Sequence, residues 1–214
     1  MFYKCKKKNI ENSITHKIYQ KISQEDYTIG TISDLCSFFC ISKKTVYKQF
    51  ASKDEFLLIL LTYLNAESAN ELEKIIGNEK EFITQIIQIF TMLISKTNKK
   101  NKIQESYGKQ NQEIDFLNEI FRMIFTNIIS KLLEKMNNKS ALNIGINFFL
   151  FAEVVVKFII ETLNNKFHKN NSVQIDLFIK YILINSLKGI CTISEHKKID
   201  GYVLNYETIL FQEL

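Results

Sequence analysis

A short stretch near the amino terminus concentrates side chains that could bind a polyanion. Lysines, hydroxyls and one tyrosine occupy the segment Ser42–Phe50, whose apolar residues Val46 and Phe50 are spaced by four. That spacing places the two apolar residues on one face of a helix and the cationic and hydroxyl groups on the other. Ammonium groups pair with phosphates or with guanine O6 and N7 atoms, so the pattern predicts a helix that docks on nucleic acid. The candidate contacts are Thr31, Ser42, Lys43, Lys44, Thr45, Tyr47, Lys48 and Lys53.

Helix start signals on both sides place this segment inside a helix-turn-helix. Thr31 and Asp34 stand three residues apart, before a run whose apolar residues recur at i, i+3, i+4 and i+7. This pattern predicts a first amphipathic helix, and Ser42 is a suitable amino-terminal cap for the second. Ser52 and Glu55 form a capping-box pattern that predicts a third helix directly afterwards. In such a motif the second helix enters the major groove of the duplex.

Three runs of residues carry a family resemblance: Asp34–Cys36, Ile41–Tyr47 with Phe50, and Ser52–Leu57. Across them the sequence resembles the amino-terminal domain of the tetracycline-repressor (TetR/AcrR) family of bacterial transcriptional regulators. The resemblance implies a three-helix domain that binds double-stranded DNA. It also implies that Thr45, Tyr47 and Lys53 contact the DNA backbone, while Lys43 and Lys44 face bases or phosphates.

The positive charge of the chain gathers in its first quarter. The 214 residues carry 28 basic and 23 acidic side chains, a net charge of +5. Residues 1–53 hold ten lysines and four acidic residues, a net charge of +6, which leaves −1 for the remainder. This placement favours an amino-terminal part that meets phosphate groups. A solvated basic surface is the alternative, and the tail over residues 1–8 can equally be a solvated terminus.

Helical patterns fill the rest of the chain. Proline is absent and glycine occurs six times, so long helices can form. The predicted helices cover residues 9–24, 53–76, 79–96, 111–136, 140–167 and 172–193, with a polar loop over 97–102 and one more packing helix in the tail 195–214. The expected fold is all-α, with a helix-turn-helix DNA-binding domain over residues 1–51 and a helical ligand-binding and dimerisation domain over residues 52–214.

The predicted helices over residues 140–167 and 172–193 are apolar around nearly their whole circumference. A helix of this kind must be buried on more than one side, and a domain of this size offers too little cover for both. A second copy of the chain would supply that cover. The resemblance implies the same arrangement, because TetR-like proteins dimerise through a four-helix interface made by their last two long helices.

Aromatic residues are abundant in the second predicted domain, with methionines among them. The resemblance implies an apolar inducer pocket there, which flexible aromatic and methionine side chains would suit. Ordinary core packing is the alternative for each of them. The candidate pocket residues are Phe82, Phe90, Met92, Phe121, Phe125, Phe148 and Phe151.

Other kinds of chemistry find little support in the sequence. Cys36 and Cys40 are four apart, but no further ligand completes a metal site, and the three histidines are scattered. We therefore expect neither a metal, nor a cofactor, nor an enzyme. The four cysteines fit free thiols in a reducing cytoplasm, and the longest apolar stretch is too polar for a membrane span.

Two functional hypotheses remain. The first is a ligand-responsive transcriptional regulator, most simply a repressor, that binds a palindromic operator as a homodimer. The second is a helical protein–protein adaptor whose helix-turn-helix has lost DNA binding. Steep salt dependence of duplex binding would distinguish the first from the second, because phosphate contacts release counterions.

Overall fold

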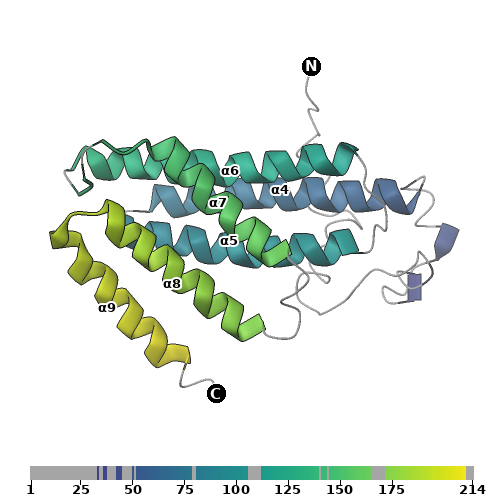
Figure 1. The fold of residues 1–214 in the computed structure, drawn as a ribbon. Helices are drawn as coiled ribbons and strands as arrows, with labels where there is room; N and C mark the ends of the chain where they lie inside the picture. The colour runs from purple at the N-terminus through teal and green to yellow at the C-terminus, as the bar shows by residue number, and fades with distance from the viewer. Residues whose placement is uncertain are drawn as a thin grey trace. The chain divides into compact units, whose positions relative to one another are not determined.

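The computed structural model describes residues 33, 36–37, 42–44, 50, 52–78, 81–105, 112–139, 141–143, 145–164 and 172–210. The elements that it defines are α4 (Lys53–Gly77), α5 (Phe82–Glu105), α6 (Gln112–Asn137), α7 (Phe148–Asn164), α8 (Ser172–Ile190) and α9 (Ile193–Leu210) (Figure 1). The described residues contain no β-strand, only an isolated antiparallel bridge between Leu142 and Cys191. The predicted all-α class is confirmed. No helix in the described part of the chain combines the length and apolar content that a bilayer crossing requires.

The chain divides into two compact units. Unit 1 contains Met1–Glu67 and Asn98–Glu119, and unit 2 contains Ser68–Thr97 and Ile120–Leu214. Each unit has its own cluster of buried apolar side chains. The predicted domain boundary after residue 51 stays a prediction, because few residues before it are described.

The first half of α4 provides most of the buried apolar side chains of unit 1. The Ser52 hydroxyl accepts a hydrogen bond from the Glu55 backbone N–H at 3.1 Å, as the predicted cap requires. The apolar side chains behind the cap are almost fully buried: Phe56, Leu57, Leu60, Leu61 and Leu64. The Phe50 ring packs against Phe56 with its centroid 4.8 Å away. Phe50 therefore anchors the segment before α4 to the core of this unit.

Helix α5 corrects one prediction. The expected polar loop over residues 97–102 is helical, and α5 continues to Glu105. The buried face of α5 is polar over this stretch, because Thr97 and Lys100 are both buried. The next buried residue at the same spacing is the apolar Ile103. Polar residues on an inward face remove the apolar periodicity that identifies a helix in a sequence. Burial also lowers the pKa of Lys100 to about 8.

Helix α7 is shorter than predicted. It begins at Phe148 and not at Ser140, because Gly145 adopts a φ of 93°, which a helix excludes. The Asn147 side chain then caps α7 by accepting a hydrogen bond from the Leu150 N–H at 2.9 Å.

The segment before α7 pairs with the end of α8 instead of forming a helix. The Asn143 N–H donates to the Ile190 carbonyl at 2.8 Å, and the Thr192 N–H donates to the Ala141 carbonyl at 3.0 Å. Accordingly α8 ends at Ile190, three residues before the predicted end. The predicted tail helix is present as α9.

The core of unit 2 draws on all six helices. Buried apolar side chains come from the second half of α4, the first two thirds of α5, the latter part of α6, and from α7, α8 and α9. Helices α8 and α9 follow one another as a hairpin (Figure 1). Ion pairs supplement this core, with Lys96 Nζ 3.0 Å from Glu71 Oε1 and Arg122 Nη1 2.6 Å from Glu153 Oε1.

One buried amide closes the carboxyl end of α4. Gln85 on α5 is 3% exposed, and its Nε2 donates to the carbonyls of Ile75 at 3.0 Å and Asn78 at 2.8 Å. The Ile75 carbonyl has no partner within its own helix, because the last four carbonyls of a helix lack a following N–H, and Asn78 lies directly after α4. Gln85 therefore fixes the turn between α4 and α5.

We predict that Gln85→Met destabilises the protein by about 1 to 3 kcal/mol, because it removes the donor of two partly buried hydrogen bonds. The matched control is Gln88→Met, one turn later on α5 at a partly exposed position. Urea denaturation followed by circular dichroism measures both. Equal stability of the two variants would contradict the role assigned to Gln85.

Candidate functional site

Three of the residues predicted to contact nucleic acid, Ser42, Lys43 and Lys44, are described by the structure and are accessible to solvent. Ser42 is not helical and the next two residues, Lys43 and Lys44, are, which matches Ser42 as a helix cap. All three are exposed, whereas Cys36 and Phe50 are buried in the core of unit 1. The two described apolar positions of the motif, Cys36 and Phe50, are thus buried, and its described lysines are exposed.

The remaining members of this set divide into one described residue and four others. Lys53 begins α4 and is partly exposed. Thr31, Thr45, Tyr47 and Lys48 lie outside the described residues. The assignment of the whole set to DNA contact stays a prediction.

The predicted pocket residues all lie in or against the core of unit 2. Phe90, Met92, Phe121 and Phe125 are buried, and the rings of Phe121 and Phe125 have centroids 5.1 Å apart. The other three, Phe82, Phe148 and Phe151, are partly buried against the same core. Their role in ligand binding stays a prediction, and Phe82 is the one of the seven that lines the cavity described next.

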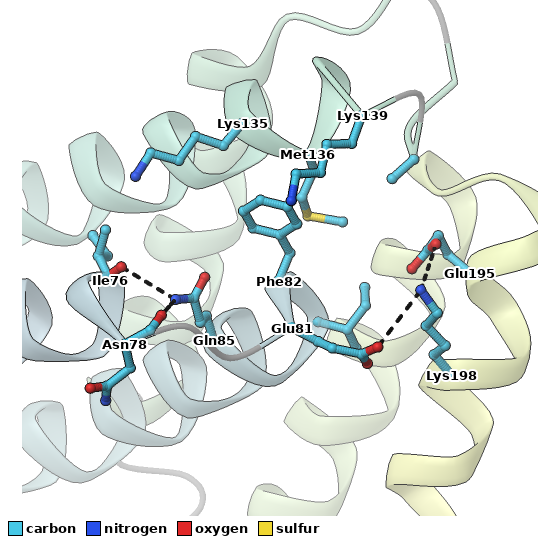
Figure 2. Close-up of a pocket in the computed structure, with 12 residues that line it drawn as sticks. Ile76, Asn78, Glu81, Phe82, Gln85, Lys135, Met136, Lys139, Glu195 and Lys198 are labelled. Atoms are coloured by element: carbon cyan, nitrogen blue, oxygen red, sulfur yellow. Dashed lines mark hydrogen bonds and ion pairs between the residues drawn. The ribbon is translucent and has the colours of Figure 1, made fainter.

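A cavity of about 700 Å³ lies in unit 2, bordered by the end of α4, the start of α5, the end of α6 and the start of α9 (Figure 2). Phe82, Ile83 and Met136 supply apolar lining. The charged lining comprises Glu81, Lys135, Lys139, Glu195 and Lys198. Sequence reasoning missed this cavity, because its residues come from four separate helix ends; the lysines at the end of α6 were the available signal.

The charges of the cavity are distributed unevenly. Lys198 Nζ lies 3.0 Å from Glu195 Oε1 and 4.0 Å from Glu81 Oε1. The hydrogen bond and charge of Glu195, aided by the charge of Glu81, raise the pKa of Lys198. On the α6 side, Lys139 Nζ lies 4.7 Å from the centroid of the Phe82 ring. The anionic side chains therefore gather near α9 and two lysines near α6.

The described cysteines are buried free thiols. Burial raises the pKa of Cys191 to about 11, and the nearby charge of Glu195 acts in the same direction. A thiol of this kind forms little thiolate, which is the reactive form. Cys36 is also buried. Cys40, which follows it by four residues in the sequence, lies outside the described residues. No group of three or more possible metal ligands occurs within the described ranges.

Helix α7 presents an uncovered apolar face. Leu150 and Val154 are 55% and 58% exposed, and Phe149 beside them is also exposed. Tyr181 on α8 is exposed as well. Leu150 and Val154 are one turn apart, so their exposed side chains are neighbours on the surface of α7.

No family model matches the sequence, and no curated protein matches it. Solved structures do match. The reduced form of NemR from E. coli is 12% identical with a TM-score of 0.63, over 83% of this chain and 97% of that one. A TetR-family transcriptional regulator from Agrobacterium tumefaciens is 10% identical with a TM-score of 0.63, over 83% and 100%. The fatty acid degradation regulator FadR from Bacillus halodurans is 16% identical with a TM-score of 0.60, over 82% and 96%. The chain therefore has a TetR-type fold.

We predict that Cys191 is alkylated slowly in the folded protein. At pH 8 a pKa of about 11, against an ordinary 9.0, lowers the thiolate fraction and hence the rate roughly 100-fold. Iodoacetamide labelling, followed by mass spectrometry of the peptide that contains Cys191, measures this rate with and without guanidinium chloride. Similar rates in both conditions would show that the thiol is neither buried nor shifted in pKa.

Proposed function

We propose that this protein is a DNA-binding transcriptional regulator. The observation that carries the proposal is the TetR-type fold, together with exposed Lys43 and Lys44 directly after Ser42, where the helix-turn-helix pattern expects base and phosphate contacts. The excess of lysine over acidic residues before residue 54 supports it, since the phosphate backbone supplies much of the affinity of such proteins. The matched regulators share the fold, and DNA binding by this chain is inferred from its own residues.

The regulator acts as a homodimer in this proposal. The exposed Leu150 and Val154 of α7 and Tyr181 of α8 lie in the two regions for which the sequence predicted a partner chain. A symmetric pair uses the same surface on both copies, so a single apolar face is sufficient. A second copy packed on this face would remove its apolar side chains from water.

The dimer would present two recognition helices to one face of the duplex. Half-sites separated by one helical turn, about 34–36 Å, or a multiple of it, fit such a pair and call for a near-palindromic operator. A small molecule that binds more tightly to a dimer with a different spacing of the two helices releases DNA. It can shift the equilibrium only by the difference between its affinities for the two states. Repression is the simplest result, because occupying an operator needs no further contact.

We predict that duplex affinity falls steeply with salt, and that Lys53→Ala reduces the slope of log K against log salt by about one unit. Lys74→Ala is the matched control, since it removes an exposed lysine from the other end of the same helix. Fluorescence anisotropy on duplexes selected by the purified protein from random sequence measures both slopes. Absence of duplex retention, or affinity indifferent to salt, would favour the adaptor hypothesis.

We predict that Val154→Glu and Leu150→Glu each convert the dimer to a monomer, because a carboxylate would be buried without a partner at the interface. Phe116→Glu is the matched control: Phe116 is 59% exposed, as Val154 is 58% exposed, but it belongs to unit 1. Sedimentation velocity gives the oligomeric state, and circular dichroism shows whether each variant is folded. Folded dimers in both α7 variants would place the interface elsewhere.

A further inference from the structure

The cavity in unit 2 has a fixed apolar lining. Phe82 in the first turn of α5, Ile76 in the last turn of α4 and Ala141 after α6 are its partly exposed apolar residues. Gln85 borders the same cavity and is held by the carbonyls at the end of α4. A volume of about 700 Å³ lies within the range of small-molecule sites. The lining is therefore pre-formed for a ligand with an apolar body.

The charges of the cavity select the sign of the ligand. Three lysines and two glutamates line it, a net charge of +1. Lys198 is already engaged by both glutamates, as Figure 2 shows. Lys135 and Lys139, on the α6 side, have no carboxylate partner among the residues that the structure describes. The unbalanced positive charge of the cavity therefore lies on its α6 side.

The position of Lys139 is set by a contact between helices. Its N–H donates to the Met136 carbonyl at 3.0 Å, directly after α6, and its ammonium lies over the Phe82 ring of α5 (Figure 2). The cation is therefore held beside the apolar lining.

We propose that this cavity binds a small monoanion with an aromatic or alkyl body. The head group pairs with Lys139 and Lys135, and the body packs on the partly exposed apolar lining residues Phe82, Ile76 and Ala141. An ammonium and an apolar ring at one place suit such an amphipathic anion better than a neutral apolar molecule, which would leave the lysines unused. Binding of the anion does not depend on the proposed regulatory function. A role of this cavity as an effector site does rest on that proposed function.

The test uses two dyes of the same ring system. The anionic probe is 8-anilinonaphthalene-1-sulfonate, and the neutral probe is N-phenyl-1-naphthylamine. The variant Lys135→Glu/Lys139→Glu replaces two exposed lysines, and Lys131→Glu, one turn earlier on α6 and also exposed, is the matched control. Fluorescence titration of the full-length protein should show at least a tenfold loss of affinity for the anionic probe in the double variant. Affinity for the neutral probe, and both affinities in the control, should be unchanged.

Three results would overturn the proposal: unchanged affinity of the double variant for the anionic probe, an equal loss in Lys131→Glu, or an equal loss for the neutral probe. A signal abolished by Val154→Glu would also overturn it, because the dye would then lie on the α7 face. If the double variant does not fold, Lys139→Gln replaces it, with the same expectation in direction and a loss of at least threefold.

The effector role is tested separately by anisotropy on duplex DNA with and without the anionic probe. Loss of DNA affinity that disappears in the double variant supports this role. Probe binding without any change in DNA affinity would overturn the effector role and leave the binding site established. Failure of duplex binding in all conditions would instead count against the proposed function.

Discussion

The arrangement of unit 2 depends on how the last carbonyls of α4 are paired. The carbonyls of Ile75 and Asn78 accept hydrogen bonds from the buried Gln85 amide, which requires α5 to start within a few residues of Gly77. The start of α5 is then fixed beside the end of α6, and the cavity with its lysines lies at this junction. One amide thus links the packing of three helices to the proposed ligand site.

Much of the helical framework could be read from the sequence, and the failures have physical causes. The cap at Ser52 and the stop at Gly77 set α4 correctly, because both signals are local. The polar run after Lys96 misled the prediction, since burial of Thr97 and Lys100 depends on neighbours far away in the sequence. The start of α7 was misplaced because the apolar content of residues 141–146 suggests a helix, whereas Gly145 and the pairing with the end of α8 exclude one.

The candidate site residues show the same division between local and tertiary information. The helix start after Ser42, with Lys43 and Lys44 in its first turn, could be predicted because a helix-turn-helix is a local motif with a fixed spacing, whereas DNA contact by these residues stays a prediction. The aromatic residues of unit 2 could not be divided between core and pocket, since both uses give the same composition, and the buried Phe121 and Phe125 are core by position. The cavity near Lys139 escaped prediction because four helix ends form it. The exposed face of α7 was anticipated as excess apolar surface, before the structure showed which side chains of the helix remain uncovered.

The buried ammonium of Lys100 has a consequence for how folding and protonation are linked. Its pKa of about 8 lies below the ordinary 10.5, which an unfolded chain restores. Between these two values the unfolded state holds a proton that the folded state has released, so unfolding takes up a proton there and the folded state gains stability as the pH rises. Below pH 8 both states are protonated, and the folded state carries the full desolvation penalty, on the order of 3 kcal/mol for this shift. Alkaline solution therefore relieves a cost that this turn of α5 carries at neutral pH.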